Sequence, residues 1–350
     1  MAASFALAFA LLPAAISAAP TDSASSPPVP MIFDTDMDTD CDDVGALAML
    51  HALADAGEAT ILATPVSSKF PYSGPCTAAL NGWYGRPDLP VGVPKGEGAA
   101  IDRGSRYAKQ IAETYPSVSR GTRFQTNADA PDAVRVYREV LAARPDVADD
   151  PAGGVVVASV GYLTNLRDLL ASEPDDLSPL SGPELVKAKV RLWVCMGGRY
   201  PEHRDPGVYG NFKPDPSSAV AAARDWPTPI LFSGLGEDVL TGGTLSSTPA
   251  ENPVRRAYKL YLGDKPARPS WDPIVVLYAV RPDAPFWTVR EEGFNEIFPN
   301  GTNAWRSEPN DPRHRLLEFT DGVEKKDVRD AMNELMTREP AVQSQSPKPR

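Results

Sequence analysis

Short apolar runs alternate with segments of helical periodicity along most of the chain. The apolar runs predict buried strands at residues 29–33, 58–66, 89–93, 154–160, 190–196 and 229–232. Apolar residues recur at helical spacing over residues 44–53, 131–142, 274–280 and 325–336. Strands that alternate with helices are typical of an α/β fold with a mainly parallel sheet. We therefore expect a single α/β domain over residues 31–340.

The two ends of the chain do not follow this pattern. Residues 1–19 form a short apolar stretch that ends in small residues, which is typical of a secretory signal peptide, although Lys and Arg are missing from it. Residues 20–30 are rich in Ser and Pro and predict a flexible leader, and residues 341–350 predict a polar tail. We expect export to the periplasm or the medium, and no segment that spans a membrane.

Composition narrows the class of function. With 42% hydrophobic residues over 350 positions, the chain can bury a large core. Its net charge of −11 argues against nucleic acid as a partner, because phosphate binding requires patches of Lys and Arg. Its three cysteines are too few and too scattered for a disulfide framework or a zinc site. A small molecule is the expected partner, and self-association is left open.

An acidic run follows the first apolar run directly. It places six aspartates within ten residues, namely Asp34, Asp36, Asp38, Asp40, Asp42 and Asp43. A strand would deliver these carboxylates to the carboxyl edge of the sheet, where open α/β folds bind their ligands. Clustered carboxylates repel one another unless a cation neutralises them, and hard oxygen ligands suit Ca²⁺ or Mg²⁺. The run therefore predicts a metal site.

Three other interpretations of the acidic run compete with this one. An EF-hand loop that started at Asp34 would need Gly and Glu where the chain has Thr39 and Gly45, so it is excluded. A run of charged residues usually forms a solvent-exposed loop. This run lies between two apolar elements, which disfavours that interpretation. A Mg²⁺-dependent aspartyl-phosphate phosphatase would use Asp34 as its nucleophile. That family usually has Thr or Val four residues later, where this chain has Asp38.

The acidic run resembles the N-terminal signature of the inosine–uridine-preferring nucleoside hydrolases. That signature is Asp-x-Asp-x-x-x-Asp-Asp after the first strand, and this chain has Asp34-x-Asp36 and Asp42-Asp43 with two extra residues between the pairs. The longer spacing resembles a branch of bacterial and fungal nucleoside-hydrolase-like proteins. Further matches follow in family order: Gly161-x-Leu-Thr-Asn165, Met196-Gly-Gly198, Asn211 with the later Asp215-Pro, and Asp272.

The resemblance implies a doubly wound fold and Ca²⁺-dependent hydrolysis of the N-glycosidic bond of ribonucleosides, with release of base and ribose. The implied metal ligands are Asp36, Asp43, Asp272 and the backbone carbonyl of Val160. Asp36 is also the implied catalytic residue, and Asp34 is implied to support the acidic run. The implied contacts to the substrate are Asp42, Met196, Asn211 and Trp271.

Three positions depart from the family pattern. Phe70 stands near the place of an Asn that approaches the ribose, Tyr209 replaces a Glu, and Trp271 replaces a His that helps the base to depart. A Trp can stack on a base but cannot donate a proton in acid catalysis, and no histidine lies in a matched motif. These departures affect sugar and base contacts and spare the metal ligands. The alternative function is therefore a Ca²⁺-dependent binding protein for ribosyl compounds, or a hydrolase of another ribosyl substrate.

Overall fold

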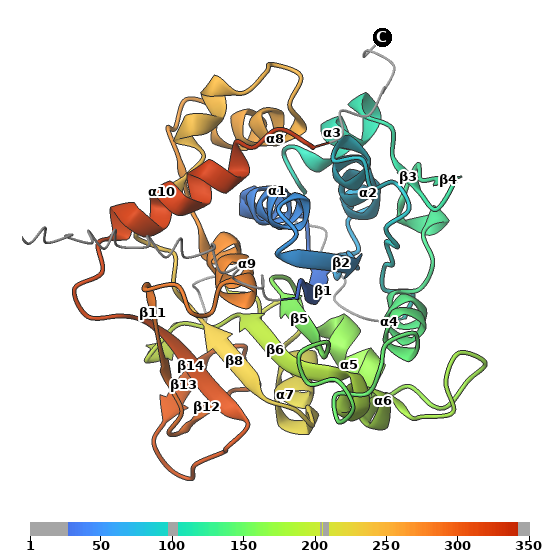
Figure 1. Ribbon diagram of the computed structural model, residues 1–350, viewed down its shortest axis with the longest axis vertical. Helices are drawn as coiled ribbons and strands as arrows, with labels where there is room; N and C mark the ends of the chain where they lie inside the picture. Colours follow the sequence, from blue (N-terminus) through green and yellow to red (C-terminus); the bar gives the residue numbers. More distant parts are fainter. Residues whose placement is uncertain (1–26, 97–103, 204, 206–209, 342–350) are drawn as a thin grey trace, which may run out of the picture.

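A seven-stranded sheet forms the centre of the structure (Figure 1). The structure is a computed structural model, which describes residues 27–96, 104–203, 205 and 210–341. The strands of the central sheet are β1 (Val29–Asp34), β2 (Ala59–Ala63), β5 (Val155–Ser159), β6 (Val190–Met196), β8 (Ile230–Ser233), β11 (Trp287–Arg290) and β14 (His314–Phe319). Their order is β11-β14-β8-β6-β5-β1-β2, and every neighbouring pair is parallel except β11 with β14.

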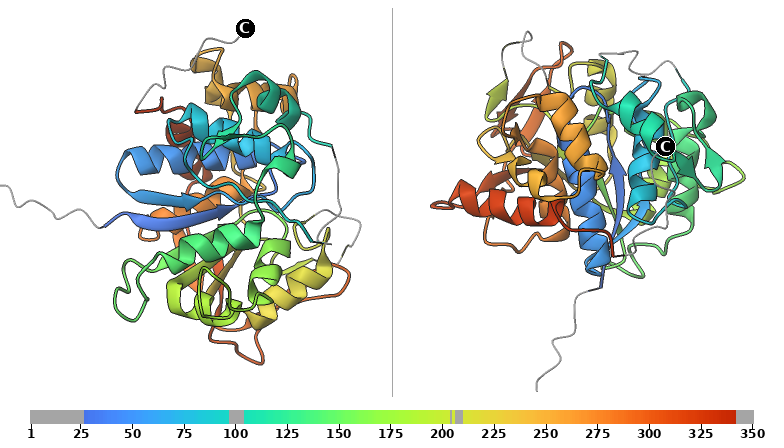
Figure 2. Two further views of the ribbon diagram at one scale, coloured as in Figure 1. Left: turned by 90° about the vertical axis from the view of Figure 1, so that its right-hand side faces the viewer. Right: turned by 90° about the horizontal axis from the view of Figure 1, so that it is seen from above.

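Helices cover both faces of this sheet, which confirms the doubly wound α/β fold (Figures 1 and 2). One face carries α1 (Asp42–Asp55), α2 (Ser73–Trp83), α3 (Ala108–Thr114), α8 (Pro253–Leu262), α9 (Trp271–Val280) and α10 (Lys325–Met336). The other carries α4 (Ala133–Ala142), α5 (Thr164–Leu170), α6 (Gly182–Lys189) and α7 (Pro216–Asp225). Helix α1 is apolar almost all round because α9 and α10 enclose it. Among the described residues, no helix combines the length and the apolar character that a membrane crossing requires.

Successive strand residues alternate between two hydrophobic clusters, one on each face of the sheet. In β1, Met31 and Phe33 pack in the cluster that contains α1, whereas Ile32 packs in the cluster that contains α5. Side chains of β5 and β6 alternate in the same way. A strand that is buried on both faces must be apolar at every position, which is why these strands read as continuous apolar runs.

Strand β6 and helix α10 begin and end at the residues expected from the sequence, but two segments differ. Residues 89–93 do not form the expected strand: the segment is extended and accepts hydrogen bonds at the carbonyls of Pro90 and Gly92. Pro90 and Pro94 have no N–H to donate, so a regular ladder cannot continue there. The expected leader, residues 20–30, overlaps β1, which already includes Val29 and Pro30. Residues 1–26, which include the expected signal peptide, and residues 342–350 of the expected tail lie outside the described residues.

Small sheets and short helices were not expected from the sequence. They include β3 (Val118–Ser119) with β4 (Thr122–Arg123), β9 (Leu240–Thr241) with β10 (Arg268–Pro269), and a sheet of β7 (Glu202–His203), β12 (Phe294–Ile297) and β13 (Asn303–Arg306). Single turns of 3₁₀-helix occur at Asn127–Asp129 and Gly243–Ser247. Strands of two to four residues carry too little periodicity to be recognised in a sequence.

His51 of α1 is fully buried in a position that suits only its neutral form. Its Nε2 lies 3.0 Å from the side-chain oxygen of Asn81, and its Nδ1 lies 3.3 Å from the Arg86 guanidinium. Because Arg86 can only donate, Nδ1 must be the acceptor and Nε2 must carry the proton. Burial, and then the charge of Arg86, lowers the pKa of His51 to about 3.

His51 should therefore make the protein less stable as the pH falls. Below pH 6.5 the unfolded chain takes up a proton at His51, whereas the folded chain takes it up only near pH 3. The free energy of unfolding should thus fall by about 1.4 kcal/mol per pH unit within this window. Denaturant titrations should show that the stability advantage of wild type over His51→Gln shrinks by about 2 kcal/mol from pH 7 to pH 5. Parallel pH profiles of the two proteins would contradict this account of His51.

Candidate active site

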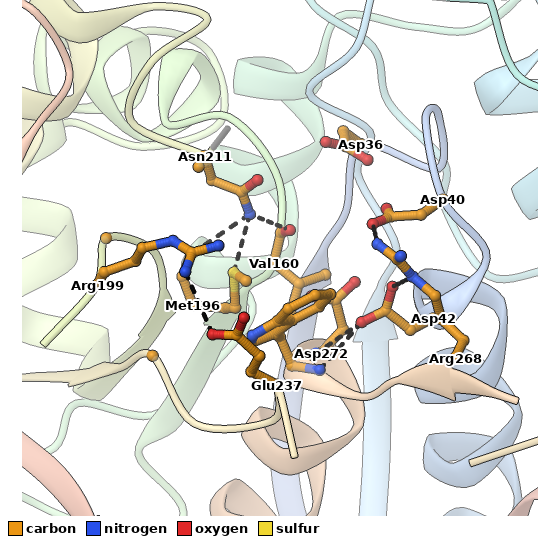
Figure 3. A pocket seen from close by; sticks show the side chains of 14 residues that line it. Asp36, Asp40, Asp42, Val160, Met196, Arg199, Asn211, Glu237, Arg268 and Asp272 are labelled. Carbon is orange, nitrogen blue, oxygen red and sulfur yellow. Dashed lines mark hydrogen bonds and ion pairs between the residues drawn. The ribbon is translucent and has the colours of Figure 1, made fainter. Parts of the chain in front are cut away.

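A pocket of about 240 Å³ lies at the carboxyl edge of the central sheet (Figure 3). Residues from the loops after β1, β5, β6 and β8 line it, together with the first turn of α9. The strand order reverses here, because β2 pairs with one edge of β1 and β5 pairs with the other. Open α/β sheets bind ligands at such a switch point, so the pocket is where the fold predicts a site.

The structure brings most of the predicted site residues together. Of the nine predicted residues, seven line the pocket: Asp36, Asp42, Val160, Met196, Asn211, Trp271 and Asp272. In Figure 3, Asp36, Asp40 and Asp42 lie opposite Asn211 and Met196. Asp34 and Asp43 do not line the pocket, and both are about 1% exposed.

Residues 34–43, which we call the acidic loop, turn sharply at Met37. Met37 has a φ of 45°, which is rare for a residue with a side chain, and its side chain is fully buried. Its N–H donates to the Asp43 carboxylate at 3.2 Å, and its carbonyl accepts from the Ser73 hydroxyl at 3.1 Å. The Thr35 hydroxyl also donates to Asp43. These contacts hold Asp43 inside the turn and compensate the unfavourable backbone conformation.

The carboxylate of Asp34, at the end of β1, accepts hydrogen bonds from side chains of α4 and α5, which cover the face of the sheet opposite to α1. Its Oδ2 accepts from the Tyr137 hydroxyl at 2.8 Å and from the Asn165 amide at 3.0 Å. Burial raises the pKa of Asp34 to about 7, although the hydrogen bonds from Asn165 and Tyr137 act in the opposite direction. Asp34 is therefore engaged in joining β1 to α4 and α5, and it does not face the pocket.

Asp42 joins the starts of two helices. It lies in the first turn of α1, and its Oδ2 accepts from the backbone N–H groups of Trp271 at 3.1 Å and Asp272 at 3.3 Å. Ser270, the residue before α9, makes no side-chain cap, so Asp42 satisfies N–H groups that the helix itself leaves unpaired. A negative charge is favourable at a helix N-terminus. Asp42 thus places Asp272 beside the acidic loop.

Four carboxyl groups around the pocket have raised pKa values. Burial is the largest cause at each of them, namely Asp36, Asp42, Asp43 and Asp272. Neighbouring aspartates raise these pKa values further, most directly Asp43 for Asp36 and Asp42 for Asp272. The pKa of Asp43 reaches about 7. Burial and mutual repulsion both disfavour the charged forms, so a cation in the pocket would stabilise these carboxylates.

The opposite wall of the pocket presents amide, carbonyl and thioether groups. The Asn211 side-chain N–H group donates to the Val160 carbonyl at 2.5 Å and lies 3.2 Å from the Met196 sulfur. Asn211 is 5% exposed, so these contacts hold it in a fixed orientation. A carbonyl oxygen has two lone pairs, and the Val160 carbonyl can accept a second ligand while Asn211 occupies the first.

Gly161 brings this wall close to the acidic loop. A Cβ at this position would overlap the backbone nitrogen of Asp36 and the Ser67 hydroxyl, and would lie 2.8 Å from the Thr35 carbonyl carbon. We expect Gly161→Ala to displace the acidic loop and to lower the free energy of unfolding by about 1–3 kcal/mol. Denaturant unfolding measures the change. Gly57→Ala is a poor control because Gly57 has a positive φ. At Gly96 a Cβ would meet no atom of the described residues within 4 Å, so Gly96→Ala should leave stability unchanged within about 0.5 kcal/mol.

Known structures resemble this fold, although no protein-family model and no curated protein matches the sequence. The inosine-uridine preferring nucleoside hydrolase from Bacillus anthracis matches with a TM-score of 0.63 at 13% sequence identity, over 88% of this chain and 99% of its own. A plant nucleoside hydrolase matches with a TM-score of 0.63 at 20% identity, over 89% of this chain and 99% of its own. This chain has the nucleoside hydrolase fold.

A further match comes from outside the enzymes that are named as nucleoside hydrolases. The type III effector protein XopQ, solved in complex with adenosine diphosphate ribose, has a TM-score of 0.59 at 14% identity, over 90% of this chain and 94% of its own. The fold expected from the sequence motifs is therefore confirmed. Identities of 13–20% show the fold alone, and the site must be judged on its own residues.

Within this nucleoside hydrolase fold, the carboxylate oxygens of the acidic loop and of Asp272 are the kind of ligand that a hard cation prefers. In the described part of the chain, no group of three or more His, Cys, Asp or Glu side chains is arranged to hold a metal ion. The donor set nonetheless fits such an ion, because Asp36, Asp43 and Asp272 are buried, and burial together with the charges of neighbouring aspartates raises the pKa of each.

Sequence reasoning missed several residues that line the pocket. Arg199 and Glu237 form an ion pair of 3.2 Å at one side of it, and Arg268 contacts the acidic loop at the other (Figure 3). The side chain of Glu237 is 70% exposed and still borders the pocket. Arg268 stands four residues before Asp272, and this proximity was the available sequence signal.

The three departures from the family pattern have different outcomes. Trp271 lines the pocket, whereas Phe70 is buried against Tyr72 and does not line it. Tyr209 lies outside the described residues. None of the described residues that line the pocket is a histidine. His51 and His314 are instead buried in packing positions, so neither is a candidate to protonate a leaving group.

Proposed function

We propose that the chain is a nucleoside N-ribohydrolase that depends on Ca²⁺. The observation that carries the proposal is the grouping of Asp36, Asp42 and Asp272 with Asn211 and the Val160 carbonyl in one pocket of a nucleoside hydrolase fold. Acidic groups gather on one wall and hydrogen-bonding groups suited to a sugar gather on the other. This arrangement supports a substrate that offers hydroxyl groups to both walls.

The residues that would hold Ca²⁺ are Asp36, Asp43, Asp272 and the carbonyl of Val160. Bound Ca²⁺ would supply the positive charge that keeps these carboxylates ionised, binds ribose hydroxyls and makes a water molecule more acidic. Burial of the carboxylates and their mutual repulsion support a cation at this position. The contacts of Asp43 with Thr35 and Met37 support a fixed ligand on the inner side of the loop.

The chain's own residues divide the chemistry among them. Asp36 accepts a proton from the attacking water, whose oxygen forms a bond to the anomeric carbon of the ribose. The N-glycosidic bond breaks through an oxocarbenium-like state, and its electron pair stays on the nitrogen of the departing base. Asn211 and Asp42 hold ribose hydroxyls, and Met196 packs against the sugar. Trp271 stacks on the base, which takes its proton from solvent.

A second candidate is a protein that binds or hydrolyses a different ribosyl compound. Arg199 favours it, because this cation borders the pocket near Asn211 and is 41% exposed. The effector that was solved with adenosine diphosphate ribose has a similar fold. The phosphatase alternative is disfavoured, because Asp34 is about 1% exposed and hydrogen-bonded to Tyr137 and Asn165, and a nucleophile must reach its substrate.

Hydrolysis of inosine and uridine in oxygen-18 water separates these functions. Cleavage at the anomeric carbon should place the label in ribose and leave the free base unlabelled, as mass spectrometry would show. Phosphate release from an aryl phosphate would favour the phosphatase instead. Folded, Ca²⁺-loaded protein that binds adenosine diphosphate ribose but releases no ribose from either nucleoside would favour the second candidate.

A further inference from the structure

Arg268 of β10 makes contacts with both the acidic loop and the aromatic rim of the pocket. Its terminal nitrogen forms an ion pair with Asp40, and its Nε lies 3.7 Å from Asp42 Oδ1. The guanidinium carbon lies 5.3 Å from the centre of the Tyr261 ring and 5.0 Å from that of the Trp271 ring. The Arg268 side chain is only 21% exposed, so these contacts are largely shielded from water.

These contacts continue into the start of α9. Asp42 Oδ2 accepts from the N–H groups of Trp271 and Asp272, while Oδ1 of the same carboxylate faces Arg268. Among the described residues, neither Asp42 Oδ1 nor Arg268 Nε has a hydrogen-bond partner. The two atoms carry opposite charges and lie 3.7 Å apart, so they attract each other without a hydrogen bond. Asp40 lies in the part of the acidic loop that is two residues longer than the signature it resembles.

We infer that Arg268 is a positioning residue that fastens the acidic loop to the start of α9 through Asp40 and Asp42. The inference rests on the proposed function, since its effect is to set the distance of Asp36 and Asp43 from Asp272. The longer acidic loop leaves Asp40 free to move unless it is held, and Arg268 holds it. The guanidinium also lies over the Trp271 ring, and this cation–π contact helps to hold the ring at the pocket.

The test removes the Arg268–Asp40 ion pair without changing the net charge of the site. Arg268→Met alone would remove a positive charge and so strengthen the attraction of Ca²⁺, which would mask a loss of geometry. The double variant Arg268→Met/Asp40→Asn removes one charge of each sign. Calorimetric titration with Ca²⁺ should show a dissociation constant about 10–100-fold higher than that of wild type, the usual effect of losing residues that orient metal ligands.

Two further variants control the interpretation. Arg290→Met/Glu318→Gln removes an exposed ion pair on β11 and β14, and should leave the dissociation constant within about twofold of wild type. Arg268→Lys keeps the charge but loses the planar contact with Trp271 and the reach to Asp42. It should bind Ca²⁺ several-fold more weakly than wild type, about midway to the double variant. If the double variant does not fold, the Ca²⁺ dissociation constant of Arg268→Lys tests the inference alone.

The outcomes distinguish the inference from the proposed function. A double or Lys variant that binds Ca²⁺ within about twofold of wild type would overturn the positioning role, even if wild type hydrolyses nucleosides. A wild-type protein that binds Ca²⁺ but releases no ribose would overturn the proposed function, while a weaker double variant would still support the positioning role. A wild-type protein that binds no Ca²⁺ would overturn both.

Discussion

Replacing Asp36 with Asn is expected to lower kcat for ribose release by about 10³-fold while the fold stays intact. Asp36 lines the pocket and is the implied proton acceptor, and Asn has the same shape but cannot accept the proton of water. Stability should not fall, because burial and the charges of Asp43 and Asp40 already disfavour the ionised form of Asp36. Steady-state assays of ribose and thermal unfolding without Ca²⁺ measure the two effects separately.

Asp321→Asn is the matched control for this variant, because Asp321 is exposed between β14 and α10. It should change neither kcat nor the unfolding temperature. Retention of more than about a tenth of the wild-type kcat by Asp36→Asn would remove Asp36 from the catalytic role. A loss of stability together with activity would instead show that Asp36 is needed for folding.

Removal of divalent cations is expected to lower activity by about 100-fold or more and to lower stability as well. Ca²⁺ that binds only the folded state at about 100 times its dissociation constant should raise the free energy of unfolding by about 2.7 kcal/mol. Asp272→Asn should lose about 1.4 kcal/mol of this gain for each tenfold weakening of Ca²⁺ binding. Thermal unfolding with Ca²⁺ and with a chelator measures the gain directly.

The cation prediction has its own control and its own contradicting result. Mg²⁺ at the same concentration should stabilise wild type less, because it requires near-ideal octahedral geometry, and these carboxylates come from two separate segments, the acidic loop and the first turn of α9. An identical unfolding temperature with Ca²⁺ and with chelator would show that Asp36, Asp43 and Asp272 bind no cation.

Much of the site could be predicted because its residues follow strands. Asp34 ends β1, Val160 follows β5 and Met196 ends β6, so a parallel sheet must bring them to one edge. The Ca²⁺ ligand set, however, came from the family resemblance. The structure places Asp36, Asp272 and Val160 in one pocket, but within the part of the chain that it describes no three carboxylates are arranged to hold an ion.

The rest of the site depends on contacts between distant parts of the chain. Arg268 and Asp40 are 228 residues apart in sequence, and no local pattern links them. The ion pair of Arg199 with Glu237 likewise joins the ends of two different strands. Trp271 and Phe70 were both expected near the substrate, yet only Trp271 lines the pocket, because Phe70 packs into the core. Packing, which sequence periodicity does not specify, made that difference.

The most direct test of the account is ribose release by wild-type protein from a panel of purine and pyrimidine nucleosides, with Ca²⁺ and with a chelator. The account predicts release of free base and ribose from at least one nucleoside in Ca²⁺, and its loss in the chelator. No release from any nucleoside by folded, Ca²⁺-loaded protein would contradict the proposed function, and equal release in chelator would contradict the role of the cation.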